Sequence, residues 1–146
     1  MADREKVLRA KIAQLKGLEG KIVIRFRPGA RLIPTQAKLN RRFDQDFLID
    51  TGASLTTIPN AMVRQLNIPI TADTPRRRVQ TAGGTVDAYQ VTVPVIEIGG
   101  WEVTDLEVLV LDLPGQGGLG LLGLNYLQRF RMDLRSDEGM LVLEPL

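Results

Sequence analysis

Two amino-acid types that carry much of enzyme chemistry are missing, because the 146 residues include no cysteine and no histidine. Without cysteine there is no disulfide framework, no thiolate metal site and no cysteine nucleophile. Without histidine there is no serine–histidine or cysteine–histidine catalysis, no histidine zinc site and no imidazole general base. Catalysis is therefore left to carboxylates, Lys, Tyr, Ser and Thr.

Long hydrophobic runs and a strong charge imbalance are missing as well. No run of about 18 apolar residues occurs, and the charged residues 1–6 are unlike a signal peptide. We expect the chain as written to be soluble and to make no membrane contact itself; its compartment and any upstream anchor in a longer protein stay open. A net charge of +2 does not call for nucleic acid as a partner.

The pattern of apolar residues changes between Gly17 and Gly20. Before that point, apolar residues recur at helical spacing among charged ones, at Val7, Leu8, Ile12 and Leu15. They predict an amphipathic helix that packs on the domain or frays as a leader, and a short coiled coil or linker is the alternative. We expect residues 1–20 to be this leader and residues 21–146 to be one folded domain.

After the leader, the sequence favours β-strands throughout. Alternating apolar residues and turn residues predict a strand at 21–26 and four hairpins, within 37–49, 79–88, 91–111 and 132–143. Two short helices are expected, at 59–66 and in the segment that runs from Leu124 to Phe130. Because no long helix follows the leader, the core must be sheet and the fold all-β.

The most informative segment is Asp50-Thr51-Gly52, which follows the apolar run 47–49 and precedes Ala53-Ser54. A strand that ends in a carboxylate, a small hydroxyl residue and a glycine can present that carboxylate on the floor of a cleft. The plainer interpretation is a turn in which Asp accepts backbone N–H bonds. A second element, Leu121-Leu122-Gly123, follows about seventy residues later. The two segments together are a more specific signal of an active-site loop than the triplet alone.

In their order, these elements resemble the retropepsin-like aspartic proteases, the family of retroviral proteases and their single-domain bacterial relatives. The resemblance runs from Ile22 to Leu143 and includes the triplet, a flap-like hairpin around 82–84 and the element at 121–123 with its following helix. It implies a small closed-barrel-like β domain with a flap hairpin and short helices. Bacterial relatives are sometimes tethered to a membrane by a preceding segment.

The resemblance implies an aspartic endopeptidase that uses no cofactor and no metal, with Asp50 as the catalytic residue. This chemistry needs two carboxylates that share one proton. Because the chain carries one triplet, we expect two identical chains to meet and form one site for a peptide or protein substrate. The implied supporting residues are Thr51, Gly52, Ala53, Ser54, Leu122 and Gly123, and the implied flap and substrate-binding residues are Ala82, Gly83 and Gly84.

Two positions depart from the retroviral pattern. Retroviral members usually have an acidic residue two places after the triplet glycine and an arginine directly after the second glycine, and these two form an ion pair. Here the positions hold Ser54 and Leu124. Both partners are replaced together, which indicates a coherent variant. The other Asp-Thr pair, at 73–74, is followed by proline, which lacks an N–H and cannot replace the glycine.

Other functions stay open at this point. The same fold can serve as a dimerisation or peptide-binding module without turnover. The arginines at 76–78 and 41–42 can form a basic patch for nucleic acid or an acidic peptide, although a solvated strand edge is the simpler interpretation. The glycines between 115 and 120 lack the Lys and Ser/Thr of a phosphate-binding loop and predict a flexible connection.

Overall fold

The computed structural model of the protein describes residues 3–9, 17–81, 83–115 and 117–146. Residues 3–9 are helical and exposed, and residues 17–20 form a turn. Val7 and Leu8 of the expected leader helix lie in this helix, whereas Ile12 and Leu15 fall outside the described residues. Among the described helices, none has both the length and the apolar character needed to cross a membrane. The division at residue 20 stays a prediction.

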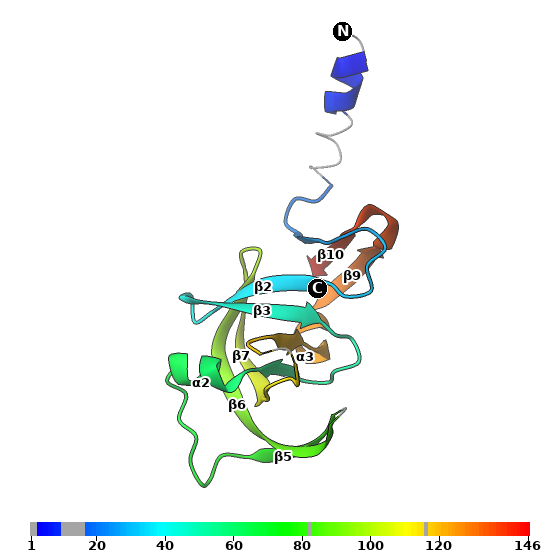
Figure 1. The fold of residues 1–146 in the computed structure, drawn as a ribbon. Coiled ribbons are helices and arrows are strands. Elements are labelled where there is room, and N and C mark those ends of the chain that lie inside the picture. The colour runs from blue at the N-terminus through cyan, green and yellow to red at the C-terminus, as the bar shows by residue number, and fades with distance from the viewer. Residues whose placement is uncertain (1–2, 10–16, 82, 116) are drawn as a thin grey trace.

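In the rest of the described chain, the regular secondary structure is mostly β-strand, joined by turns and loops (Figure 1). The strands are β1 Ile22–Arg25, β2 Pro34–Leu39, β3 Phe43–Ile49, β4 Thr56–Ile58, β5 Arg76–Thr81, β6 Gly84–Ile98, β7 Trp101–Val110, β8 Gly120–Leu122, β9 Phe130–Arg135 and β10 Met140–Pro145. The short helices are α2 Asn60–Gln65 and α3 Leu124–Leu127, with a 3-10 turn at Ser136–Glu138. The all-β prediction is confirmed.

A closed barrel forms the centre of the fold. Its sheet has the strand order β2-β3-β8-β4-β7-β6-β5, and β2 also pairs with β6, so that six strands close on themselves while β5 remains at the edge. A smaller sheet, β1-β10-β9, lies beside it. Figure 1 shows β5 at the end of the domain opposite β9 and β10.

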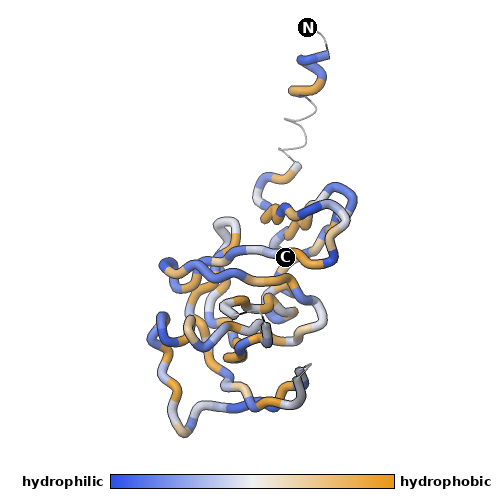
Figure 2. Tube along the Cα trace, in the orientation of Figure 1, coloured by the Kyte–Doolittle hydropathy of each residue, from blue (hydrophilic) through white to orange (hydrophobic). Residues whose placement is uncertain are grey.

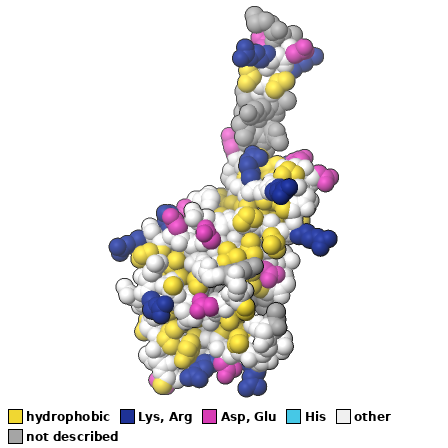
Figure 3. All heavy atoms as spheres, viewed as in Figure 1, with side chains coloured by type: hydrophobic (Ala, Val, Ile, Leu, Met, Phe, Trp, Pro, Cys, Tyr) yellow, Lys and Arg dark blue, Asp and Glu magenta, His cyan; other side chains and the backbone are white. Residues whose placement is uncertain are grey.

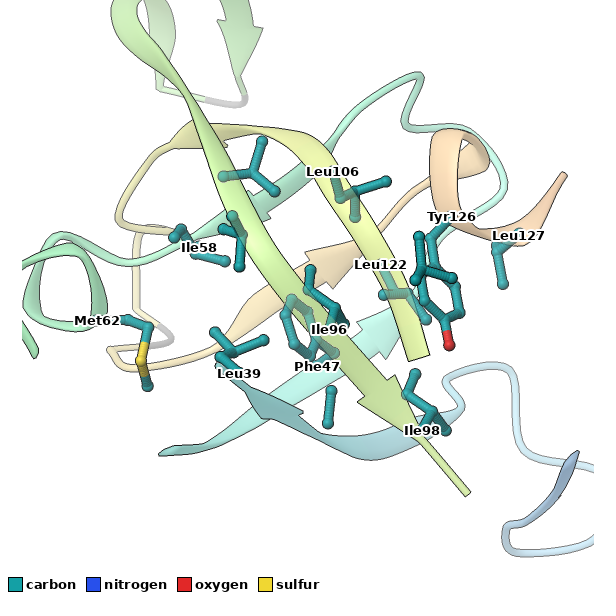
Figure 4. Packing of buried hydrophobic residues seen from close by; sticks show 14 of the residues in the cluster. Leu39, Phe47, Ile58, Met62, Ile96, Ile98, Leu106, Leu122, Tyr126 and Leu127 are labelled. Atoms are coloured by element: carbon teal, nitrogen blue, oxygen red, sulfur yellow. The ribbon is translucent and has the colours of Figure 1, made fainter. Parts of the chain in front are cut away.

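Side chains fill the barrel because successive residues of a strand point to opposite faces. Figure 2 shows hydrophobic and hydrophilic residues alternating along the strands. Leu39, Phe47, Ile96 and Leu122 are all fully buried and pack together with Tyr126 of α3 (Figure 4). On the face drawn in Figure 3, basic and acidic side chains are scattered among one another and no face-wide basic patch is seen.

One topological feature positions the candidate site. β8 lies between β3 and β4, parallel to β3 with Ile49 beside Leu122, and antiparallel to β4 with Thr57 beside Leu121. The carboxyl ends of parallel neighbours meet at the same edge of a sheet. The segment that follows β3 at residue 50 therefore meets the segment that follows β8 at residue 123.

Several predicted elements are confirmed. Helix 59–66 corresponds to α2, and the hairpins within 37–49 and 132–143 correspond to β2–β3 and β9–β10. Gly99 and Gly100 form the turn between β6 and β7, and both have the positive φ that a tight two-residue hairpin turn requires.

Two predictions were wrong. Residues 85–88 and 91–98 were assigned to separate hairpins, but they belong to one strand of 15 residues, β6. The first part of β6 pairs with β5 and the second with β7, so a single strand serves both hairpins. The helix expected to reach Phe130 ends at Leu127, because Phe130 already pairs with Pro145 as the first residue of β9. Strand β4, only three residues long, was not predicted.

Candidate active site

Asp50 is the first residue after β3 and is held by the backbone around it. Its N–H donates to the carbonyl oxygen of Leu122 over 3.0 Å, and its own carbonyl accepts from Ala53 N–H over 3.2 Å. The N–H of Gly52 donates to Asp50 Oδ1 over 2.9 Å. Asp50 as a residue is half-buried, while Thr51 and Gly52 are exposed. The loop therefore fixes one carboxylate oxygen and leaves Asp50 at the surface of a cavity.

Gly123 lies directly behind this loop and is buried. A Cβ atom at this position would lie 2.7 Å from the carbonyl carbon of Leu55 and 2.8 Å from the carbonyl oxygen of Ala53. Both neighbours are backbone atoms, so a side chain fits only if the loop moves. The next residue, Leu124, donates its N–H to the Ala53 carbonyl over 2.8 Å. Gly123 thus permits the close crossing of the two predicted segments.

A partly buried hydrogen-bond network supports both segments, and the sequence analysis did not predict it. Thr56 Oγ1 accepts from Gly123 N–H over 3.1 Å and donates to Asn125 Oδ1 over 2.9 Å. Asn125 Oδ1 also accepts from Thr56 N–H over 2.9 Å, and Asn125 Nδ2 donates to the Glu107 carbonyl over 2.6 Å. These bonds join β4, α3 and β7. The signal that could have indicated it is the position of Thr56 shortly after residues 50–54 and of Asn125 shortly after residues 121–123.

A cavity of about 620 Å³ opens in front of Asp50. Its first wall is the loop after β3, through Asp50, Gly52, Ala53, Ser54 and Leu55. Its second wall is β5, through Arg77, Arg78, Val79, Gln80 and Thr81. The remainder, apart from Thr57, is apolar and consists of Leu109, Leu111, Leu113, Pro114 and Leu121. Among the described residues, Asp50 is the one carboxylate that lines this cavity.

The hairpin predicted as a flap is formed by β5 and the start of β6. At its tip Gly84 has a φ of +114°, and Thr81 Oγ1 donates to the Gly84 carbonyl over 2.7 Å. Gly83 is exposed, and Ala82 falls outside the described residues. Neither Gly83 nor Gly84 lines the cavity of a single chain, whereas five residues of β5 do. The structure therefore brings β5, and neither Gly83 nor Gly84, to the cavity of Asp50.

The predicted basic clusters have local contacts. Arg41 binds Glu102 with two hydrogen bonds of 2.9 and 2.8 Å; this pairing raises the pKa of the Arg41 guanidinium and lowers the pKa of the Glu102 carboxyl. The arginines at 76–78 lie in β5, which is the edge strand of its sheet, as the strand-edge interpretation expects. In the part of the chain that the structure describes, no cluster of three Asp or Glu residues is arranged to hold a metal ion.

Comparisons with known proteins agree with this geometry. The family model described as "gag-polyprotein putative aspartyl protease" matches residues 35–129, from β2 to the end of α3. A crystal structure of a retropepsin-like aspartic protease from Rickettsia conorii is similar with 25% identity and a TM-score of 0.66, over 85% of this chain and 89% of that one. No match was found among curated proteins. By the family model and the shared fold, the chain belongs to the retropepsin-like aspartyl protease family.

Proposed function

We propose that the protein is an aspartic endopeptidase whose active form is a homodimer. The observation that carries the proposal is the position of Asp50, half-buried in a hydrogen-bonded loop at the wall of a cavity that the β5–β6 hairpin borders. Hydrolysis of this kind needs two carboxylates, and each chain supplies one triplet. A two-fold symmetric dimer uses the same surface of both chains and brings the two Asp50 loops together.

In the proposed reaction, two carboxylates a few Å apart hold one proton between them, because both cannot ionise cheaply. The ionised Asp50 takes a proton from a water molecule, and that water attacks the scissile carbonyl carbon. The protonated Asp50 of the other chain donates a hydrogen bond to the developing oxyanion. The C–N bond then breaks as the amine leaving group takes up the proton that the first Asp50 accepted from water, which returns that carboxylate to its ionised form.

The neighbouring residues have proposed roles that follow from their positions. Thr51, exposed beside Asp50, contacts the partner loop across the two-fold axis and fixes the geometry of the pair. Gly52 and Ala53 keep the loop narrow, so that a substrate backbone can approach the carboxylates. Leu122 and Gly123 hold the loop from behind, with Ser54 at the cavity wall.

The hairpin tip, residues 82–84, is proposed to close over a bound peptide. Closure would exclude water and offer backbone hydrogen bonds to an extended substrate. The peptide would then lie between the loop after β3 on one side and β5 on the other, which are the two walls of the cavity.

Replacement of Asp50 by asparagine tests the catalytic role. Asp50→Asn keeps the size of the side chain but cannot ionise, and we expect it to abolish cleavage of a peptide library while circular dichroism and dimer formation stay unchanged. The matched control is Asp46→Asn, because Asp46 lies in β3, the strand that precedes Asp50, is exposed, and has a side chain that bonds only to Gln36 among the described residues. Turnover by Asp50→Asn at the wild-type rate would refute the proposal.

The requirement for two chains is tested by mixing. With equal amounts of wild-type and Asp50→Asn chains, random exchange leaves about one quarter of the dimers with two carboxylates. The activity of the mixture, as a fraction of the activity of the same amount of wild-type protein, should therefore be below the fraction of wild-type chains. The activity per chain should also fall on dilution, because dimers dissociate. Activity strictly proportional to the wild-type share would indicate that one chain is sufficient. Dimerisation without cleavage and without binding of a statine-type transition-state mimic would favour the non-catalytic module.

A further inference from the structure

We propose that Arg77 selects substrates that carry an acidic side chain close to the scissile bond, next to an apolar one. The proposal rests on the proposed function and names the substrate class of that same site. It arises from the arginines of β5, which share a strand and a charge but face different surroundings.

Two of these arginines are engaged on one face of the β5–β6 hairpin. Arg76 pairs with Tyr89 in the strand register, and its guanidinium lies 5.2 Å from the centre of the Tyr89 ring. Arg78 pairs with Asp87, and its Nε lies 3.6 Å from Asp87 Oδ1. Because Arg76 and Arg78 are two residues apart in a strand, their side chains lie on the same face. Each therefore has a partner within the hairpin.

Arg77 lies on the opposite face of β5, together with the cavity-lining residues Val79 and Thr81, whereas Arg78 lines the cavity from the face on which it meets Asp87. Arg77 pairs with Ala88, which is 2% exposed. Ala88 shares its face of β6 with Gln90, and Gln90 pairs with Leu109 of β7, which lines the cavity. The register thus places the Arg77 side chain on the same surface as a cavity-lining leucine. Arg77 itself is one of the residues that line the cavity.

The charge of the cavity leaves Arg77 available for a ligand. Among the described residues, its charged lining residues are Asp50, Arg77 and Arg78, and Arg78 already has an acidic partner. The salt bridges formed by the described part of the chain do not include Arg77. A guanidinium presents five N–H donors in a planar fork that matches a carboxylate. The carboxylate of a peptide side chain is the natural partner.

The rest of the cavity defines the neighbouring subsite. Its surface is formed by the side chains of Leu55, Val79, Leu109, Leu111 and Leu121. An apolar side chain buried here would lie between Asp50 and β5, so that the acidic side chain belongs to a nearby residue of the same peptide. In a two-fold dimer the second Arg77 offers the same contact on the other side of the scissile bond.

The experiment compares matched peptides that differ only by Glu, Gln or Lys at one position beside an apolar cleavage site. The measured quantity is the ratio of kcat/KM between peptides, because a ratio is insensitive to the fraction of folded enzyme. We expect the wild type to prefer Glu over Gln by about three- to tenfold, the range expected of a partly exposed charged hydrogen bond. Arg77→Gln should bring this ratio close to one, and Arg77→Glu should favour the Lys peptide.

Arg76→Gln is the matched control, since it removes the same charge from the other face of the same strand and should keep the wild-type ratio. High salt should reduce the preference, as screening weakens a partly exposed ion pair. Equal cleavage of the Glu and Gln peptides by the wild type, or equal effects of Arg76→Gln and Arg77→Gln, would overturn the proposal. If no peptide is cleaved, the proposed function fails, and binding of the same peptides made with a reduced, non-cleavable bond still measures the Arg77 preference.

Discussion

Replacing Asn125 by alanine removes the amide that ties α3 to β4 and β7. Its Oδ1 accepts from the N–H and the Oγ1 of Thr56, both over 2.9 Å, and its Nδ2 donates to the Glu107 carbonyl over 2.6 Å. Three lost hydrogen bonds at about 1 kcal/mol each give a destabilisation of about 3 kcal/mol. Thr56 is fully buried, so in the Asn125→Ala variant its N–H would have no partner and no access to water. We therefore expect the free energy of unfolding to fall by about 3 to 4 kcal/mol.

A double-mutant cycle separates the network from simple loss of packing. Thr56→Val keeps the shape of the side chain but removes the oxygen that bonds to both Asn125 and Gly123. Because the Thr56–Asn125 side-chain bond is absent in either single variant, the double variant should lose about 1 kcal/mol less than the sum of the two.

The free energy of unfolding is measured by urea titration, with the single tryptophan, Trp101, as the fluorescence probe. An Asp50→Asn background removes the proposed catalytic group and with it any self-cleavage, and one fixed chain concentration is used because the proposed dimer would gain apparent stability with concentration. An Asn125→Ala variant within about 0.5 kcal/mol of the parent would refute the reasoning, since that is the scatter of ordinary surface substitutions. Strict additivity in the cycle would show that Thr56 and Asn125 act independently.

Three further substitutions have defined outcomes. Gly123→Ala should cost about 1 to 3 kcal/mol in urea unfolding, because its Cβ would meet the Leu55 carbonyl carbon at 2.7 Å. Tyr126→Phe should be neutral or stabilising by up to about 1 kcal/mol in the same assay, because burial raises the pKa of the Tyr126 hydroxyl and the described residues give its oxygen no hydrogen-bond partner. Hydrogen bonds from the Asn60 side chain and backbone lower the pKa of the Asp112 carboxyl. This carboxylate therefore stabilises the fold above its unfolded pKa of about 4 and loses that effect as the pH falls. The free energy of unfolding of Asp112→Asn should therefore decrease less than that of the wild type when urea titrations are repeated at lower pH.

The position of Asp50 could be predicted because its signals are local. Residues 43–47 alternate in burial as a strand should, and the triplet follows the end of that strand at once. The contact of Asp50 with Leu122 is different, since it joins residues far apart through the parallel pairing of β3 and β8. Nothing in either segment alone specifies that β8 inserts between β3 and β4. The resemblance to a known family implied Leu122 and Gly123 as residues that support the loop, but the strand pairing itself was not predicted.

The missed features depend on tertiary context. β6 was divided in two because its pattern suggests two hairpins, but its two halves pair with different strands while the backbone continues. β4 has three residues, too few for a periodic signal. Which of the three β5 arginines faces the cavity depends on a register that a run of identical residues cannot reveal, because a shift by one residue exchanges the two faces.

The structure also gives a physical account of the two departures from the retroviral pattern. Leu124 and Asn125 donate their backbone N–H groups to the carbonyls of Ala53 and Ser54 over 2.8 and 3.2 Å. The connection between the Asp50 loop and α3 is therefore made by backbone atoms and by the Thr56 network, and it does not require a side-chain ion pair. Loss of both charges together leaves no unpaired charge behind, which is the condition under which a partly buried ion pair can be removed at low cost.

The same departure changes what the cavity can bind. An acidic residue at position 54 would stand at the cavity wall that Ser54 now lines, where it would repel an acidic substrate side chain and compete for Arg77. With Ser54 in its place, the one carboxylate among the described cavity residues is Asp50, and the proposed dimer uses that group for chemistry. Apart from Asp50, no carboxylate among the described cavity residues then competes for Arg77. The neutral residue at position 54 and the arginine on the cavity face of β5 thus favour the same class of substrate, and a Ser54→Asp variant should weaken the Glu preference that Arg77 provides.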